Sequence, residues 1–137
     1  MIIRISGQTP AQKNSKQLFK NHRTGATFIT SSKVFKSWQV DALAELERLK
    51  IRIRGRVQID YFFYVKDNRG RDLDNMIASV NDALVTACKS IDPRTGKPEK
   101  GTGILEDDSW QFVRIGSADA KIDKENPHAK ITITELD

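Results

Sequence analysis

The sequence predicts a mixed α+β fold, in which a small, mostly antiparallel or mixed sheet carries two main helices on one face. The strongest strand signal is RVQIDYFFYV, residues 56–65, which alternates between an apolar face and a more polar one. Two segments, 33–50 and 75–89, repeat apolar residues at helical spacing. The elements follow the order strand, helix, strand, helix, strand, strand, and the 137 residues suit one domain, 1–137.

The first half of the chain is predicted to hold a strand, a long basic loop and the first helix. Residues 2–6 alternate weakly and predict a strand. The next 19 residues are polar and contain Gly, Pro and Asn, which predicts a loop, with ATFIT as a short strand beside it. The helix predicted over 33–50 has its apolar residues at Phe35, Trp38, Ala42, Leu46 and Leu49.

The second half holds the strand at 56–65 and the second helix. The apolar face of that strand is expected to consist of Val57, Ile59, Tyr61 and Phe63. The helix over 75–89 follows a turn rich in Asn and Gly, with Asp74 as its predicted N-cap. Residues 90–103 contain two Pro and three Gly and predict an exposed loop, after which WQFVRIG and AKITITEL predict two closing strands.

Charge is distributed unevenly along the chain. Residues 1–56 contain 12 Lys and Arg against 3 Asp and Glu, a balance of +9, whereas residues 57–137 contain 11 against 15, a balance of −4. A basic half suggests a polyanion as partner, and nucleic acid is the simplest one. An acidic half in the same domain argues against a protein that only coats DNA. It suggests that the carboxylates have another function.

Composition argues against several other classes of protein. The one cysteine, Cys88, excludes an intrachain disulfide, and the presence of only His22 and His128 disfavours a zinc site. No apolar run is long enough to span a bilayer, and Arg4 interrupts any signal-peptide core after Met1. We therefore expect a cytoplasmic protein.

The stretch RGRDLDNMIASVNDAL, residues 69–84, places Asp72 and Asp74 two apart where a turn becomes a helix. In an extended segment, residues two apart point the same way, about 6.6 Å apart along the chain, so both carboxylates can enter one pocket. Carboxylates this close repel each other unless a cation lies between them, and Mg²⁺ prefers such oxygens together with water and phosphate oxygens. Arg69 and Arg71 are then expected to face an incoming phosphate rather than a protein carboxylate.

A second acidic cluster, Glu106-Asp107-Asp108, follows the second helix and its loop, just before a strand. A helix that runs away and a loop that returns can bring this cluster beside Asp72 and Asp74. Three carboxylates from two segments would form a metal site suited to phosphodiester hydrolysis. A D-x-D pattern by itself also fits a helix cap followed by a solvated turn, and the sequence leaves that alternative open.

The segments RDLDNMIASVNDAL and LEDDSW together resemble the signature of the RusA-type Holliday junction resolvases, small endonucleases common in phages and prophages. In that family an R-D-x-D-N segment opens a helix that ends near D-A-L, and a D-D pair follows shortly. The resemblance extends more weakly over most of the chain, including a basic loop with an asparagine, here Asn14, and a closing strand of the ITITE type.

The resemblance implies a Mg²⁺-dependent endodeoxyribonuclease, with Mn²⁺ as a substitute, that acts as a homodimer and resolves four-way DNA junctions by paired nicks. It implies catalytic residues and metal ligands at Asp72, Asp74 and Asp108, with Asp107 as the adjacent candidate. No organic cofactor and no membrane partner are expected. The residues that we expect to bind DNA are Arg69, Arg71, Lys66, Asn14, Lys16, Lys20 and Arg23.

Two features depart from the family pattern. The best-studied members carry a functional lysine four residues after the second aspartate, where this chain has Ala78. Loop 90–103 is also longer than in compact members, and it suits either a DNA-contacting flap or a tolerated surface insertion. The candidates to replace the missing lysine are Lys66, Arg69, Arg71 and Lys89.

Two other functions use the same residues differently. One is a protein that binds DNA junctions without cutting them, with Ala78 marking the loss of activity and the carboxylates serving as a cap and a solvated turn. The other is a metal nuclease that acts on flaps or replication forks.

Overall fold

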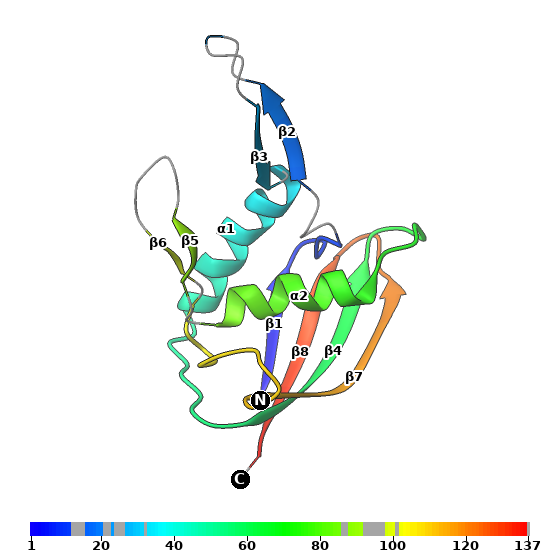
Figure 1. Ribbon diagram of the computed structural model, residues 1–137. Coiled ribbons are helices and arrows are strands. Elements are labelled where there is room, and N and C mark those ends of the chain that lie inside the picture. The colour runs from blue at the N-terminus through cyan, green and yellow to red at the C-terminus, as the bar shows by residue number, and fades with distance from the viewer. Residues whose placement is uncertain are drawn as a thin grey trace.

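The computed structural model describes residues 1–11, 16–20, 23, 27–31, 33–85, 88–91, 98–100 and 102–136. Figure 1 shows one sheet with helices packed in front of it, and two small hairpins. In chain order the elements are β1 (Ile2–Ser6), β2 (Lys16–Lys20), β3 (Thr27–Ser31), α1 (Lys33–Glu47), β4 (Val57–Val65), α2 (Leu73–Leu84), β5 (Cys88–Ile91), β6 (Pro98–Lys100), β7 (Val113–Ile122) and β8 (His128–Glu135).

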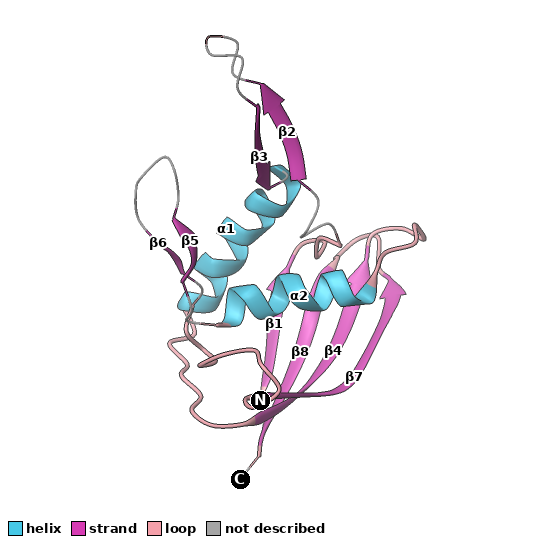
Figure 2. Ribbon diagram, viewed as in Figure 1, coloured by secondary structure: helices cyan, strands magenta, loops and turns pink. Residues whose placement is uncertain are grey.

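The central sheet has four strands in the order β1-β8-β4-β7. β8 runs antiparallel to both of its neighbours, β1 and β4, whereas β7 runs parallel to β4. Both helices lie on the same face of this sheet, as Figure 2 shows. The predicted fold class is therefore confirmed: the fold is α+β, with a mixed sheet and two main helices on one face.

The core forms between that face and the helices. β4 alternates strictly, so that every second residue from Val57 to Val65 is buried and the residues between them are half-buried. Buried apolar side chains of α2, among them Met76, Val80 and Leu84, complete the same cluster. The buried residues of α1 are Phe35, Trp38, Ala42 and Leu46, four of the five that its spacing predicts.

The N-terminal region departs from the prediction in two places. The segment predicted as one long loop contains β2, which pairs antiparallel with β3. A five-residue strand in a two-stranded hairpin has too few alternations to be recognised in a basic stretch. α1 ends at Glu47 instead of residue 50, because Lys50 adopts a left-handed backbone with φ of 52°, and Leu49 remains 44% exposed.

The second helix starts and ends earlier than predicted. Its N-cap is Asp72, not Asp74, and the helix ends at Leu84, because Val85 is extended and forms a β-bridge with Leu105. The segment 90–103 was predicted to be a loop, but it contains most of an antiparallel hairpin between β5 and β6. In the sequence, apolar residues keep a helical spacing through Ala87. This spacing does not show where strand pairing replaces the helix.

The closing strands agree better with the prediction. β8 covers the predicted segment almost residue for residue, whereas β7 starts three residues later and runs six further than predicted. Trp110, expected at the start of a strand, lies in the preceding turn and is 77% exposed. Within the described ranges, no helix combines the length and apolarity needed to cross a membrane.

Candidate metal and nucleic-acid site

The predicted motif lies in the connection between β4 and α2, residues 66–72. β4, α2 and β7 form a β-α-β unit, because β7 runs parallel to β4 and α2 lies between them in the chain. The motif therefore follows the carboxyl end of β4, the end at which open α/β sheets usually bind ligands. It also precedes the N-terminus of α2, where free N–H groups and the helix dipole favour an anion.

Asp72 and Asp74 lie on either side of the helix boundary. Asp72 has an extended backbone, and its Oδ1 accepts a hydrogen bond from the N–H of Asp74 at 3.2 Å. Asp74 belongs to the first helical turn, and both residues are exposed. The prediction that both alternate along an extended segment is wrong, since the cap begins the helix between them. Both carboxylates still belong to exposed residues at the N-terminus of α2.

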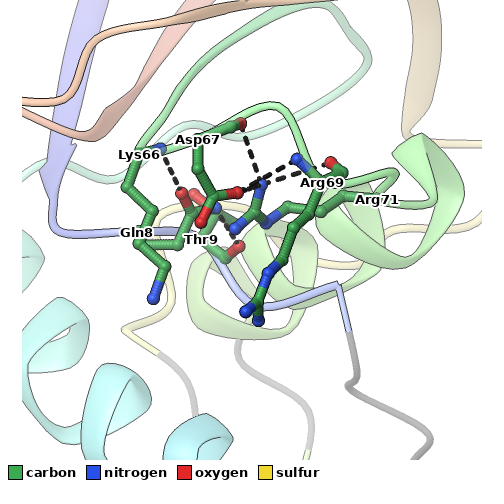
Figure 3. A network of polar contacts seen from close by, with 6 residues as sticks. All are labelled: Gln8, Thr9, Lys66, Asp67, Arg69 and Arg71. Atoms are coloured by element: carbon green, nitrogen blue, oxygen red, sulfur yellow. Dashed lines mark hydrogen bonds and ion pairs between the residues drawn. The ribbon is translucent and has the colours of Figure 1, made fainter.

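Arg71 holds the turn before the helix closed. Its Nη1 lies 2.8 Å from Oδ1 of Asp67 and donates to the carbonyl oxygens of Asp67 and Arg69, each at 3.3 Å, as Figure 3 shows. The Arg71 guanidinium, with the N–H of Arg69, holds the pKa of the Asp67 carboxyl below its ordinary value. The prediction that Arg71 faces a phosphate rather than a protein carboxylate is therefore wrong, because a tight turn brings Asp67 to it first.

A cleft of about 520 Å³ opens beside Asp72. Lys66 and Arg69 are exposed at this cleft, and in Figure 3 both side chains extend away from the pair of Asp67 and Arg71. The cleft thus combines two positive side chains with a carboxylate, which suits a phosphate group and a hard cation together. Its lining residues are Gln8, Thr9, Pro10, Ala11, Val34, Lys66, Arg69, Gly70, Arg71 and Asp72.

The wall of the cleft formed by residues 8–11 is fixed to the elements that carry the motif. Oε1 of Gln8 accepts the N–H of Lys66 at 2.8 Å, at the end of β4. The buried hydroxyl of Ser79, on α2, donates to the carbonyl oxygen of Pro10 at 2.9 Å. These contacts join the end of β1, the turn and the helix, so the cleft is held by the scaffold rather than by loop residues alone.

Asp107 and Asp108 approach the sheet from its other end. Val113, the first residue of β7, pairs with Val57, the first residue of β4, so residues 106–109 lie before the start of the parallel pair. The turn 66–72 follows the opposite end of β4. Oδ1 of Asp107 accepts the N–H of Asp108 at 2.9 Å, and both residues are half-buried.

Asp108 lies near a buried polar pair, Tyr61 and Asn81. The Tyr61 hydroxyl donates to Oδ1 of Asn81 at 2.7 Å, and both residues are buried. Burial raises the pKa of Tyr61 well above its ordinary value, and the charge of Asp108 raises it further. The charge of Asp108 therefore acts on the Tyr61 hydroxyl, which is bonded to Asn81 of α2.

Asp74 lies on the same face of α2 as Asn81, but closer to the N-terminus of the helix. Residues seven apart fall on one helical face, so Asp74 and Asn81 share a face and are about 10 Å apart along the axis. Ala78 lies between them on that face, half-buried. Ala78 is the position at which the sequence resemblance leads us to expect a lysine.

The Tyr61–Asn81 pair predicts a particular dependence of stability on pH. Because folding raises the Tyr61 pKa, its contribution is complete below the unfolded value near 10 and declines as pH rises above it, by up to about 1.4 kcal/mol per pH unit. Tyr61→Phe should lack this decline, yet lose about 1–3 kcal/mol at neutral pH because Asn81 Oδ1 loses its donor. Urea unfolding between pH 8 and 11 measures both effects, and equal alkaline slopes in the two proteins would contradict the assignment.

The oxygen donors in the cleft fit a hard divalent cation, but they do not form a complete set. In the described part of the chain, no group of three or more Asp, Glu, His or Cys side chains is placed to hold a metal ion. Mg²⁺ is often held by only one or two carboxylates, with water and phosphate oxygens as its other ligands. Asp72 at the cleft and Asp74 in the first turn of α2 can meet that requirement, and the participation of Asp107 and Asp108 stays a prediction.

The other predicted DNA-binding residues belong to the N-terminal region. Lys16 and Lys20 are the end residues of β2, and their backbones pair with Ser31 and Thr27 of β3. Arg23 is exposed. Asn14 lies outside the described residues. The role of these four residues in DNA binding stays a prediction.

Sequence reasoning missed the residues that support the site. Asp67 was overlooked, although its spacing of four residues from Arg71 in a Gly-containing turn is a usable signal for an ion pair. Asn81 was overlooked as a buried group, although its place between Val80 and Ala83 on the apolar side of α2 marks it. Gln8 carries no signal, because its contact with Lys66 joins residues 58 apart.

Comparison with models of known protein families gives no match to this chain, and comparison with curated proteins gives none either.

Proposed function

We propose that this protein is a Mg²⁺-dependent, structure-selective endodeoxyribonuclease that cuts four-way DNA junctions by paired nicks. The observation that carries the proposal is the cleft in which Asp72 lies beside Lys66 and Arg69, at the N-terminus of α2. Metal-dependent cleavage of a phosphodiester needs cations that bind its negative charge and carboxylates that hold the metal ion. The basic N-terminal half and the resemblance of the two acidic segments to the resolvase signature support the same conclusion.

Each residue at the cleft has a distinct role in this proposal. Asp72 and Asp74 supply carboxylate oxygens for Mg²⁺, which when bound polarises the phosphodiester and makes water a better nucleophile. Lys66 and Arg69 bind the phosphate oxygens and orient the scissile group between them. Arg71 positions the turn through Asp67, and the Asp72 cap fixes the start of α2. Asp108 belongs to the proposed set by resemblance, and its contribution is a matter for direct test.

A junction with two-fold symmetry calls for a protein with two-fold symmetry, so the proposal includes a homodimer with an isologous interface. Two cuts on strands of like polarity then need one cleft from each chain. This function would place the protein in the cytoplasm. Its gene would belong to the cell itself or to a phage or prophage that the cell carries.

Arg69→Ala is expected to weaken junction binding similarly for every sequence and to lower the slope of log K against log salt by about 0.9. The reason is that one exposed guanidinium at the cleft neutralises one phosphate. Arg48→Ala is the matched control, since Arg48 is exposed beyond the end of α1 and outside the lining of this cleft. Fluorescence anisotropy over a salt series measures both slopes, and an unchanged slope for Arg69→Ala would remove Arg69 from the interface.

Arg71→Lys is expected to lower the cleavage rate about 10- to 100-fold, close to the effect of Arg71→Ala. Lysine keeps the charge but loses the planar fork that contacts the Asp67 carboxylate and two carbonyl oxygens. Single-turnover cleavage measures the rates. If Lys restored the wild-type rate, Arg71 would act as a simple charge and not as a positioning residue.

The proposed specificity is tested by the products from three labelled substrates in Mg²⁺: a four-way junction, a flap and a linear duplex. We expect paired symmetric nicks in the junction and slow cutting of the other two. Equal or faster cutting of the flap would favour a fork or flap nuclease.

One specific observation favours a second candidate, a junction-binding protein without hydrolytic activity. Among the described residues the three predicted aspartates do not meet in one group, and the position of the family lysine is Ala78. Tight binding of the junction with no product in Mg²⁺ or Mn²⁺ would select this candidate.

A further inference from the structure

The face of the sheet that points away from the helices carries a cluster of rings. Strand register places Phe62 and Tyr64 of β4 on this face, because their neighbours Tyr61, Phe63 and Val65 are buried against the helices. His128 of β8 lies directly opposite Tyr64. All three rings are half-buried, although no helix covers this face in Figure 1.

The rings form one continuous cluster across two strands, in which Tyr64 and His128 are stacked and Phe62 is tilted. The Tyr64 and His128 rings are parallel within 10°, with centroids 4.2 Å apart. The Phe62 ring packs against Tyr64 at 5.0 Å. On the other side of Tyr64, Nζ of Lys121 lies 5.6 Å from the ring centroid. Tyr64 thus contacts Phe62, His128 and Lys121, and His128 is the ring of this cluster next to the edge strand β1.

A backbone contact fixes the orientation of the His128 ring, and the side chain beside the ring on β1 is short. Nδ1 of His128 lies 2.7 Å from the carbonyl oxygen of Asn126, which fixes the orientation of the ring. The next residue in the same row of the sheet is Ser6 of the edge strand β1. The Ser6 side chain is exposed and too short to cover an imidazole. A flat ring placed over Ser6 would therefore extend the stack of Tyr64 and His128.

The row beside this stack supplies positive charge. Arg4 of β1 and Lys130 of β8 are opposite each other, and Lys130 is next to Phe62. The nearby carboxylate of Asp60 is already bound by Ser117, at 2.9 Å, and by Gln58. Asp119, next to Phe62 on β7, is on the side of the stack away from Arg4. The open end of the stack thus lies beside two cations, Arg4 and Lys130, and the carboxylate of Glu45 accepts the backbone N–H of Ser6 at 3.0 Å.

We propose that this face binds single-stranded nucleic acid, with an unpaired base stacked on His128 over Ser6 and its phosphates bound by Arg4 and Lys130. Aromatic rings on an open sheet with flanking cations give this chemistry without sequence preference, because every base has a flat face. Bases in a duplex are already stacked, so duplex DNA does not compete for the ring. The site is on the opposite side of the sheet from α2 and does not depend on the cleavage proposed above.

The experiment measures binding of a fluorescein-labelled dT 12-mer to the full chain in EDTA, which removes the divalent metal that the proposed cleavage needs. His128→Ala is expected to weaken binding about ten-fold, whereas His128→Phe, which keeps a ring, should bind within about two-fold of the wild type. Thr134→Ala is the matched control, because Thr134 is exposed on the same face near the far end of β8. An unlabelled duplex of equal length should compete poorly.

Equal affinity of His128→Ala and wild type for the 12-mer would overturn the proposal. So would equal loss in His128→Ala and His128→Phe, which would show a structural effect rather than stacking. If sedimentation shows that His128→Ala dissociates a dimer while 12-mer binding is unchanged, the face is an interface between copies, and the proposal also fails. Because every readout is made without metal, none of these results bears on the junction cleavage.

Discussion

Asp74→Asn is expected to lower junction cleavage by about 100- to 1,000-fold while junction binding stays within about two-fold of the wild type. Asparagine has nearly the same shape as aspartate and is compatible with the first turn of α2, so the fold should be unaffected. It lacks the negative charge that holds a divalent cation beside the phosphate. Single-turnover cleavage and anisotropy, measured on the same preparation, separate the two effects.

The matched control for this substitution is Asp60→Asn. Asp60 lies on β4, on the opposite face of the sheet from α2, and its carboxylate accepts hydrogen bonds from Ser117 and Gln58. The charge change is the same, but the cleft is untouched, so cleavage should remain at the wild-type rate. Equal losses in Asp60→Asn and Asp74→Asn would show that net charge, not a metal ligand, controls the reaction.

Asp108→Asn decides whether the second acidic segment belongs to the same site. A loss as large as that of Asp74→Asn would mean that Asp108 joins Asp72 and Asp74 when DNA and metal are bound. If Asp108 only affects the buried Tyr61–Asn81 pair, cleavage should change little, and the alkaline stability of the protein should change instead.

Phe63→Ala is expected to lower the free energy of unfolding by about 3–5 kcal/mol. Phe63 is fully buried in the centre of β4, where its ring lies beside that of Tyr61 at 6.2 Å. Loss of the ring leaves a cavity between the sheet and the helices. Since small domains are stabilised by only about 5–15 kcal/mol, the variant should lose a large part of its stability. Urea unfolding at neutral pH measures the change.

Phe62→Ala provides the comparison for this prediction. Phe62 is the preceding residue on the same strand and has the same side chain, but it is on the half-exposed face. Its truncation should therefore lower the stability much less. Equal effects of the two substitutions would contradict the assignment of one face of β4 to the core.

The sequence predicted the parts of the fold that depend on periodicity. β4 alternates over nine residues and α1 repeats over several turns, so one face of each is defined by apolar side chains alone. The sequence predicts the boundaries of α2 less accurately. Its start depends on which aspartate turns its carboxylate toward the helix, and its end depends on the pairing of Val85 with Leu105, 20 residues away. Neither event changes the local apolar pattern.

The sequence predicts the part of the candidate site whose residues are close together in the chain. It does not predict contacts between residues that are far apart in the chain. Asp72, Lys66 and Arg69 are within seven residues of one another, and the structure brings them to one cleft. Asp108 is 36 residues from Asp72, and its position depends on β7 being parallel to β4. A parallel partner begins at the end of β4 away from the turn at 66–72. The sequence pattern does not show which strand β7 pairs with or in which direction.

We propose that carboxylates at the start of α2 hold a metal ion that the DNA cleavage requires. The most direct measurement is cleavage of a labelled four-way junction by the wild-type protein, with Mg²⁺ present and with Mg²⁺ replaced by EDTA. We expect paired nicks in Mg²⁺, no product in EDTA, and full recovery of cleavage when Mg²⁺ is added back in excess. Binding without product in every divalent metal tested, or cutting that continues in EDTA, would contradict the proposal.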